Sequence, residues 1–597
     1  MAGEHTPDQV HVLLAEAREC LRADRLRDAE VRCRQVLQSD PSNAHALWLL
    51  GSVLRKGGNA GFAVALLERA AKLAPLEAHI QHSLGLAYRA LGRTALAENS
   101  LRRAAALAPL DAPVLVDLGV FYLEQSQWQR AEECFEAALE GDPEHLNAHL
   151  DLGATRLRRG QLAGAIAAFR RALEIDPGFA DAQSNLLYAL HFDPDTDSQA
   201  LVALAEDWGR RHADPLGRCV PPHDNDPDPE RRLRVGYVSG DFRTHPVAYF
   251  LEGVLSQHDR NEVEIFAYSA TKIVDSTTRR LQNLTDRWRL IAGLKDADAA
   301  DLIREDGIDV LVDLSGHTDG HRLLLFAQRP APVQATWLGT FGTTGLAAMD
   351  YFLGDRYVTP ESGTSVSEQV VRLPDSYQCF SPQVTAAVGP LPAATNGYVT
   401  FGCFNRAIKL SAKVIEPWSR ILNEIPDARL CLKDPAFDEP AVAEQYLDLF
   451  RANGIADSRI CMLGQTAHAE HVAAYSGIDI ALDPFPFSGC TTSVEALWMG
   501  VPVITLPTDR FAGRTTASYL HTLRLPELIA TNADDYVALA VALARDTHHL
   551  ALLRGTLRQR LLDSPLCDAP RFARGLEAAF RQMWRHWCRS SVEGPGK

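Results

Sequence analysis

The chain has 597 residues, of which 46% are hydrophobic and 23% charged, and its formal net charge at pH 7 is −16. This length exceeds what one hydrophobic core supports, so two to four domains are expected, and the acidic balance argues against nucleic acid or an anionic membrane as the main partner. The 11 cysteines are scattered without a C-x-x-C pair, which indicates neither a disulfide framework nor a zinc site, and most are expected to be buried as small hydrophobic residues.

The first ten residues, MAGEHTPDQV, lack a basic segment followed by an apolar one. No run of about 18 apolar residues occurs along the chain. We therefore expect a cytoplasmic protein.

Residues 10–179 carry an internal repeat with a period of 34 residues. Small residues recur where two helices would cross closely, and a proline recurs where the second helix must end. The recurring residues are Pro41, Pro75, Pro109, Pro143 and Pro177, with Gly51, Gly85, Gly119 and Gly153, and with Ala29, Ala63, Ala97, Ala131 and Ala165. The pattern matches tetratricopeptide repeats and predicts an α-superhelix with a concave groove over residues 1–192. Its capping helix is expected at 179–189, because Leu187 replaces the expected glycine.

Residues 193–232 are rich in proline and aspartate and read as a linker around a short helix at 201–212. From Leu233 onward, short apolar strands alternate with helices, first over residues 233–395 and again over 396–590. This alternation predicts two Rossmann-like α/β domains with a ligand cleft lined by the carboxyl ends of their strands. The strands are expected within 233–241, 263–269, 308–316, 331–339 and 350–355, and then within 398–405, 428–435, 458–464, 477–484 and 501–507. A last helix, from about 571 to 585, is expected to pack back across the domain pair.

Ser488–Pro507 joins a turn of small polar residues to a helix and a buried strand. Residues 489–492 precede the helix, so backbone N–H groups and hydroxyls are expected to converge on a phosphate at the positive end of its dipole. Glu495 lies one helical turn after Thr491, where it can accept a hydrogen bond from a ribose hydroxyl. The alternative is an ordinary capped helix with Thr491 or Thr492 as its N-cap.

Two single residues carry weaker signals. His245 follows a predicted strand and precedes Pro246 at the expected mouth of the cleft, although a lone histidine there is more often structural. Lys409 stands just before a helix capped by Ser411, where its ammonium could meet a pyrophosphate, and the alternative is a solvated surface lysine.

The order of these motifs resembles one enzyme family. VGYVSGDFRTHP, DLSGHT, RPAPVQATWLGTFGTTG, MDY, FGCFNRAIKL, HAEHVAAY and CTTSVEALWMGVPVIT follow the repeats in this order. From about residue 10 to 580 the chain is similar to bacterial members of the tetratricopeptide-containing O-linked N-acetylglucosamine (O-GlcNAc) transferases. The resemblance implies the glycosyltransferase B fold and an inverting, metal-independent reaction without a cofactor. It also implies UDP-GlcNAc as donor and protein acceptors bound through the repeat groove.

The resemblance assigns roles to individual residues. His245 would be the general base or a positioning group, and Lys409 would meet the donor phosphates. The donor-binding set implied by the resemblance is Arg406, Lys409, Thr466, Ala467, His468, His471, Ala474, Cys490, Thr491, Thr492 and Glu495. His317, Thr318 and Arg322 follow a predicted strand, and together with Leu338 and Gly339 they are expected at the sugar or acceptor pocket.

Some positions depart from the animal members. Arg406 replaces a glutamine, Ile408 a tyrosine and Cys490 a histidine. At the groove positions of an asparagine ladder, this chain has Leu49, Ser83, Asp117, Asp151 and Asn185. The same fold with another donor, such as the GDP-fucose of related plant transferases, remains an alternative, as does an inactive repeat scaffold. Retention of the donor-site residues argues against the scaffold.

Overall fold

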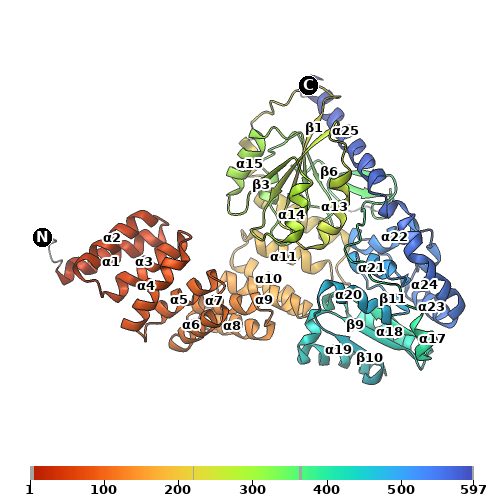
Figure 1. The fold of residues 1–597 in the computed structure, drawn as a ribbon, viewed down its shortest axis with the longest axis horizontal. Coiled ribbons are helices and arrows are strands. Elements are labelled where there is room, and N and C mark those ends of the chain that lie inside the picture. The colour runs from red at the N-terminus through yellow and green to blue at the C-terminus, as the bar shows by residue number, and fades with distance from the viewer. Residues whose placement is uncertain (1–5, 220, 362–365, 594–597) are drawn as a thin grey trace. The chain divides into compact units, whose positions relative to one another are not determined.

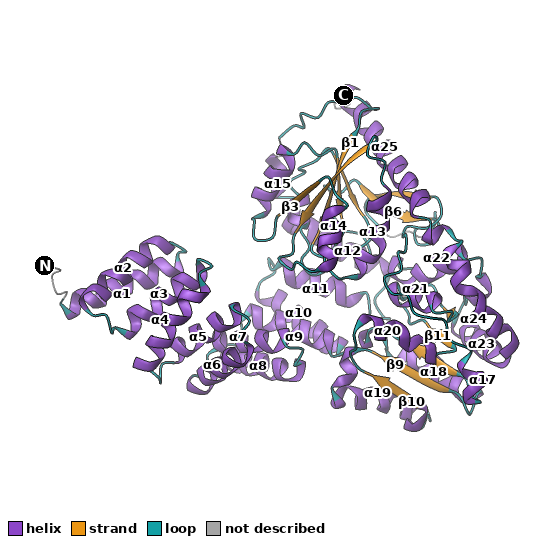
Figure 2. Cartoon of the chain, in the orientation of Figure 1, coloured by secondary structure: helices purple, strands orange, loops and turns teal. Residues whose placement is uncertain are grey.

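The computed structural model describes residues 6–219, 221–361 and 366–593. The chain divides into two compact units. The first comprises residues 1–156 with 167–177, and it is built from paired helices (Figure 1). The second comprises residues 157–166 with 178–597, and it holds two parallel β-sheets with their covering helices (Figure 2).

The predicted repeats are antiparallel helix pairs. In the first unit α1 packs on α2, α3 on α4, α5 on α6, and α7 on α8. Their bounds are α1 Pro7–Arg22, α2 Leu26–Ser39, α3 Ala44–Lys56, α4 Ala60–Leu73, α5 Ala78–Ala90, α6 Thr94–Leu107, α7 Ala112–Glu124 and α8 Trp128–Gly141. The fifth predicted repeat supplies α9 (Leu146–Arg158) and α10 (Leu162–Ile175).

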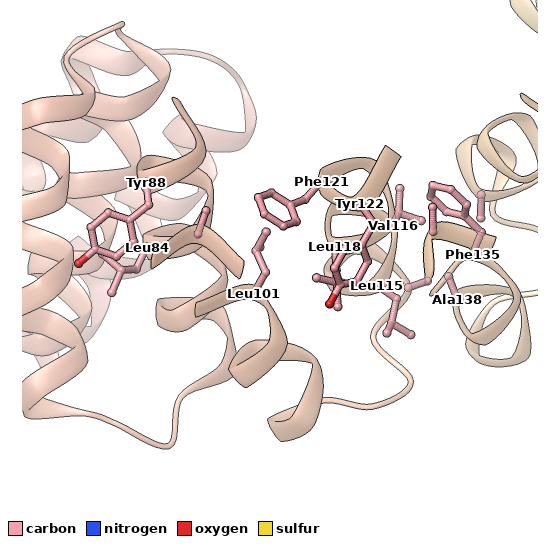
Figure 3. Close-up of a cluster of buried hydrophobic side chains, with 14 of the residues drawn as sticks. Leu84, Tyr88, Leu101, Leu115, Val116, Leu118, Phe121, Tyr122, Phe135 and Ala138 are labelled. Atoms are coloured by element: carbon pink, nitrogen blue, oxygen red, sulfur yellow. The ribbon is translucent and has the colours of Figure 1, made fainter. Parts of the chain in front are cut away.

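The periodic glycines mark the crossing points of these pairs. A Cβ atom at Gly85 would lie 2.7 Å from the Cγ of Leu101, and one at Gly119 would lie 2.6 Å from the Cε1 of Phe135. Both distances are below van der Waals contact, so only glycine lets the two helices approach this closely. Leu101 and Phe135 belong to the buried cluster that runs through these repeats (Figure 3).

The predicted capping helix is α11 (Ala180–Leu190), and the predicted linker is partly helical. It contains α12 (Ser198–Trp208), a π-helical turn at Gly209–Ala213 and a 3-10 turn at Leu216–Cys219. Trp208 is fully buried, and its Nε1 donates a hydrogen bond to the carbonyl of Ala180 at 3.0 Å. Residues 198–219 are therefore packed helical structure, while residues 221–232 form the irregular connection that was predicted.

The first sheet has seven parallel strands in the order β3-β2-β1-β4-β5-β6-β7. Their bounds are β1 Leu233–Ser239, β2 Val263–Ser269, β3 Arg287–Leu290, β4 Val310–Asp313, β5 Val333–Thr336, β6 Tyr351–Asp355 and β7 Gln369–Leu373. Its helices are α13 (Pro246–Gln257), α14 (Ser276–Asn283), α15 (Asp296–Glu305) and α16 (Leu323–Phe326). The strand order reverses between β1 and β4, which is where such sheets bind ligands.

The second sheet has five parallel strands in the order β10-β9-β8-β11-β12. Their bounds are β8 Thr400–Cys403, β9 Arg429–Lys433, β10 Ile460–Leu463, β11 Ile480–Leu482 and β12 Val503–Ile504. Its helices are α17 (Pro392–Asn396), α18 (Ala412–Glu424), α19 (Pro440–Ala452), α20 (His468–Ala474), α21 (Thr491–Trp498), α22 (Thr515–Thr522), α23 (Ala533–Arg545) and α24 (Thr547–Leu562). The reversal lies between β8 and β11, so the segments after these two strands face each other.

The last helix, α25 (Ala569–Glu593), packs on the first sheet, which belongs to one of the two domains that the helix was expected to cross, and it is longer than expected. It packs on α13, β5 and β7 (Figure 2). The Nδ1 of His258 lies 2.8 Å from the Oε1 of Glu577, and the Nε1 of the buried Trp584 donates to the carbonyl of Asp228 at 2.9 Å. Among the described helices, none is long and apolar enough to cross a bilayer.

Candidate active site

The ammonium of Lys409 is held at the switch point of the second sheet. Lys409 ends a 3-10 turn after β8, and its Nζ donates to the Oδ1 of Asn405 at 3.0 Å and to the carbonyl of Ser488 at 2.7 Å. It also lies 4.5 Å from the ring centroid of Phe487. Burial lowers the pKa of Lys409 to about 8, against the attraction of Asp483. Lys409 is therefore a fixed, half-buried cation and not a solvated surface lysine.

The adjoining helix α21 starts without a side-chain cap. Its N-cap residue is Cys490, and neither Thr491 nor Thr492 makes the capping bond of the ordinary alternative. The hydroxyl of Thr492 donates instead to the Oδ1 of Asn405 at 3.1 Å. The first N–H groups of a helix point along its axis and favour an anion. Ser411 at the start of α18 likewise makes no capping bond, contrary to prediction.

Asn405 links these two features, and the sequence pattern did not single it out. Its buried Oδ1 accepts hydrogen bonds from both Lys409 and Thr492. The turn before α21 is held in place by a hydrogen bond, because the backbone N–H of Gly489 donates to the carboxylate of the buried Asp483 at 2.6 Å. One amide oxygen thus couples the cation to the start of the helix.

Cys490 faces the segment that leaves the first sheet. Its Sγ lies 3.3 Å from the Nε2 of Gln378 and 3.4 Å from the hydroxyl of Tyr519. Burial raises the pKa of the Cys490 thiol. Cys490 is therefore a neutral thiol in a polar contact between segments from both α/β domains.

The carboxylate of Glu495 is buried and already has a protein partner. Its Oε1 lies 2.6 Å from the Nε2 of His468, and its Oε2 lies 3.8 Å from the Nε2 of His471. The ring of Tyr249 on α13 stacks on His468, with centroids 5.0 Å apart. Burial lowers the pKa of His471 to about 4, so this ring is neutral at pH 7. Tyr249 thus lies beside the candidate site, and no sequence pattern had pointed to it.

The remaining residues of the predicted donor set lie around this group. Thr466 and Ala467 form the exposed loop between β10 and α20, and Ala474 ends α20. The guanidinium of the exposed Arg406 donates to the hydroxyl of Tyr188 on α11 at 2.9 Å. The interaction of Arg406 with phosphate stays a prediction.

His245 caps α13 at the switch point of the first sheet. Its Nδ1 lies 3.4 Å from the backbone nitrogen of Val247 and 3.6 Å from the Oδ2 of Asp241. Burial lowers the pKa of His245, so the ring is neutral at pH 7. The two contacts favour different tautomers, because Nδ1 accepts a hydrogen from Val247 but would have to donate one to Asp241.

Two residues predicted at the sugar pocket have internal partners instead. His317 is buried, with Nδ1 3.1 Å from the hydroxyl of Ser184 and Nε2 2.9 Å from the carbonyl of Thr344. The guanidinium of Arg322 donates to Asp296 at 2.6 Å and to two backbone carbonyls. Their contacts support a structural role and give the predicted pocket role no support.

The other three pocket candidates shape loops. Thr318 donates its hydroxyl to the carbonyl of Ser315 at 2.7 Å. Leu338 has a positive φ of 68°, and a Cβ at Gly339 would lie 1.8 Å from the carbonyl oxygen of Leu314. Glycine is needed at 339 because the backbone that follows the neighbouring strand β4 lies so close.

The arrangement combines a fixed cation, an uncapped helix start and two imidazoles beside a carboxylate. The first two suit a diphosphate, and the last can hold a ribose and base. Within the described residues, no group of three or more His, Cys, Asp or Glu side chains is placed to hold a metal ion. Metal independence stays a prediction.

Comparison with known families and proteins gives consistent matches. Residues 220–381 and 391–576 match glycosyl transferase family 41. Residues 14–78, 78–109 and 116–178 match tetratricopeptide repeats.

Similar proteins include probable UDP-N-acetylglucosamine–peptide N-acetylglucosaminyltransferases called SPINDLY. The Petunia hybrida protein is 39% identical over 419 residues, which are 69% of this chain and 45% of that protein. The Arabidopsis thaliana protein is 39% identical over 422 residues, 69% of this chain and 46% of that protein. The chain thus spans under half the length of these curated relatives.

A solved structure resembles nearly the whole chain. It is a mutant of the Thermobaculum terrenum O-GlcNAc transferase, 38% identical, with a TM-score of 0.71 over 98% of this chain and 100% of that one. The likeness confirms the predicted fold, in which tetratricopeptide repeats precede two Rossmann-like domains of the glycosyltransferase B type.

Proposed function

This chain belongs to glycosyltransferase family 41, and from that premise we propose that it transfers N-acetylglucosamine from UDP-GlcNAc to serine or threonine hydroxyls of protein acceptors. The reaction inverts the anomeric carbon and needs no metal. The observation that carries the proposal is the placement of Asn405, whose side-chain oxygen accepts hydrogen bonds from both Lys409 and Thr492. This arrangement sets a cation beside the start of α21, where a diphosphate leaving group gains charge.

Leaving-group stabilisation is the main chemical task of this site. The acceptor oxygen forms a bond to the anomeric carbon while the bond to the β-phosphate oxygen breaks, and that electron pair remains on the diphosphate. Asn405 and Ser488 take two of the three N–H groups of Lys409, so one can meet the phosphate. Fixed donors of this kind stabilise developing charge without reorganising, and removing one typically costs about 10²–10³-fold in rate.

His245 would act on the acceptor hydroxyl through its Nε2. If Nδ1–H faces Asp241, then Nε2 is free to accept the hydroxyl proton. If Nδ1 accepts from Val247, then Nε2 carries the hydrogen and can only orient the acceptor or the sugar. The choice of tautomer therefore decides between a general base and a positioning group.

The nucleoside would bind where Glu495, His468 and His471 meet. The Glu495 carboxylate is the ribose acceptor in this proposal, and it would share the ribose hydroxyls with His468, which lies 2.6 Å away. Tyr249 places an aromatic face on the other side of His468. The base would be read by backbone and side chains of the 466–474 segment.

The repeats would choose the protein acceptor. Among the ladder positions, Leu49 is fully buried, and Ser83 accepts a hydrogen bond from the indole of Trp48 at 2.7 Å, so these two serve the repeat core. Asp117 lies 2.7 Å from the Nε2 of His82, with its side chain 34% exposed. Burial, with Asp117 nearby, raises the pKa of Asp151 to about 6. This aspartate pair is where we expect basic acceptor residues to bind.

A thermal-shift panel with UDP, GDP, UDP-GlcNAc and GDP-fucose tests the proposal. A ligand at a hundredfold excess over its Kd stabilises a folded protein by roughly 2.7 kcal/mol. UDP and UDP-GlcNAc are expected to raise the Tm, while the guanosine nucleotides leave it unchanged. The reverse pattern would assign the chain a guanosine donor, and no shift with any of the four would point to an inactive scaffold.

A further inference from the structure

Two cysteines lie side by side at the edge of the second sheet. Cys431 on β9 and Cys461 on β10 are direct partners in the parallel register, and β10 is the edge strand. Neighbouring strands run about 4.8 Å apart. A disulfide requires Cα atoms about 4.4–6.8 Å apart, so these strands already hold the two backbones within bonding range.

The two thiols differ in access and in acidity. Cys461 is exposed, whereas Cys431 is buried. The hydrogen bond with Cys431 lowers the pKa of Cys461 to about 6, and the same contact raises the pKa of Cys431. The thiolate is the reactive form of cysteine, so Cys461 is placed to react first.

No other described cysteine combines these properties. Where a pKa shift is resolved for the others, burial raises it. This group is Cys33, Cys134, Cys379, Cys403, Cys490, Cys567 and Cys588. The expectation that most cysteines are buried fits Cys33, Cys379, Cys403 and Cys588, whereas Cys134, Cys490 and Cys567 are half-buried and Cys461 is exposed.

We propose that Cys431 and Cys461 form a reversible thiol modification site, which a peroxide oxidises to a disulfide and which a trivalent arsenical bridges. The Cys461 thiolate attacks one peroxide oxygen, which breaks the O–O bond and gives a sulfenic acid and hydroxide. The Cys431 thiol then attacks the sulfenic sulfur, so the S–S bond forms and water leaves. In total, two thiols and one hydrogen peroxide give one disulfide and two waters.

The site is connected to the proposed donor pocket. β10 leads through Gly464 and Gln465 to His468, and this loop is tightly held. The backbone nitrogen of Gln465 donates to Asp438 at 2.9 Å, and Lys433 donates to the carbonyl of Gly464. A Cβ at Gly464 would lie 1.6 Å from the Oδ1 of Asp438, so the turn is tightly packed against this carboxylate. A disulfide usually spans about 5.5–6 Å between its Cα atoms, which is more than the strand spacing, so its formation would shift β10. We expect this shift to displace His468 and to weaken UDP binding, a consequence that rests on the proposed function.

The test is intact-mass and peptide mapping of the folded full chain after treatment with hydrogen peroxide at neutral pH. The parent is expected to lose about 2 Da, from two hydrogens, and to yield linked peptides containing Cys431 and Cys461. Dithiothreitol is expected to restore the mass. Cys461→Ser should not gain this link, and Cys431→Ser should stop at a sulfenic acid that a 1,3-dione reagent traps. Cys379→Ser, which removes a buried thiol elsewhere, is the matched control and should still form the link.

Phenylarsine oxide provides a second measurement without oxidation and without variants. One equivalent is expected to bind the folded parent and to protect Cys431 and Cys461 together from alkylation. A folded parent whose two cysteines stay unlinked under peroxide and unprotected by the arsenical overturns the site. UDP affinity measured before and after oxidation tests the connection separately. If the disulfide forms and UDP binds equally well before and after oxidation, the thiol site is supported and its connection to the donor pocket is refuted. If the reduced parent does not bind UDP at all, that result counts against the proposed function alone.

Discussion

Tyr249 stacks on His468, with ring centroids 5.0 Å apart and ring planes 8° apart. Tyr249 lies on α13, which follows β1 of the first sheet, and His468 starts α20, which follows β10 of the second. His468 in turn lies 2.6 Å from the carboxylate of Glu495. The two α/β domains therefore meet through an aromatic pair beside the residues assigned to the nucleoside.

Replacing Tyr249 tests whether this pair orients the nucleoside site. Tyr249→Ala is expected to weaken UDP binding by about 2–10-fold, because an aromatic pair contributes about 0.5–1.5 kcal/mol. Tyr249→Phe keeps the ring and should bind UDP as the parent does. Calorimetric titration provides both affinities, and an equal loss in the two variants would assign the effect to the phenol hydroxyl.

UDP affinity is expected to depend on pH through Lys409. Burial lowers the pKa of Lys409 to about 8, so in the unliganded protein the ammonium loses its charge as the pH rises through that value. UDP favours the charged form, and its affinity should therefore fall by up to about tenfold per pH unit above pH 8. Lys409→Arg keeps its charge, so its UDP affinity, whatever its level, should be flat over this range. A parent with equally flat affinity would show that the charge of Lys409 does not act on UDP.

The lowered pKa of Lys409 also predicts that the stability of the unliganded protein rises with pH over a range in which its UDP affinity falls. The unfolded chain binds this proton more tightly than the folded protein does, so the contribution of Lys409 to stability rises between pH 8 and its ordinary pKa of 10.5. Denaturant unfolding of the parent and of Lys409→Met, compared across this window, isolates the contribution. A difference between them that does not change with pH would contradict the shift.

His245→Ala should lower the transfer rate far more than it weakens UDP binding. Loss of a general base costs about 10²–10⁴-fold in rate, whereas the proposed partner of His245 is the acceptor and not the nucleotide. Because burial lowers the pKa of His245, the parent rate should fall only as the pH drops through a value below the ordinary 6.5. Asp241→Asn separates the two roles, since it impairs a base oriented by the carboxylate but spares a ring held by Val247. Equal losses of rate and UDP affinity in His245→Ala would make this residue structural.

The repeat aspartates are expected to select acceptors with flanking Lys or Arg. Asp117→Asn with Asp151→Asn should reduce the preference for a basic over a neutral acceptor peptide, and salt should reduce it in the parent. Hydrolysis of the donor without acceptor is the control and should not change. An unchanged preference would confine these aspartates to contacts such as the one between Asp117 and His82.

The 34-residue repeat and the short apolar runs in the sequence were sufficient to predict most of the helices and strands. The repeat glycines mark the helix crossings, and ten of the twelve strands in the described part of the chain lie within predicted segments. β3 and β7 were not predicted from the sequence. Each is an edge strand that is half exposed and includes charged residues such as Arg287 and Arg372. Neither strand therefore shows the continuous apolar run of a buried strand.

The site was less predictable, because position after a strand does not tell where a side chain points. His317 and Arg322 follow β4 and yet turn inward to protein partners. The side-chain oxygen of Asn405 binds Lys409 and Thr492, which lie far apart in the sequence. The pairing of Cys431 with Cys461 depends on the register of two strands. Such relationships appear only when the chain is folded.

In the proposed function, Lys409 and the start of α21 bind the diphosphate of a uridine nucleotide without a metal. Calorimetric titration of UDP in excess EDTA tests this binding most directly. Lys409→Met is compared with Lys413→Met, which removes an exposed lysine on the adjoining helix α18. The parent and Lys413→Met are expected to bind UDP equally in EDTA, while Lys409→Met binds about 10–100-fold more weakly, as the loss of a charged hydrogen bond implies. UDP binding that disappears in EDTA, or that survives unchanged in Lys409→Met, would contradict the account.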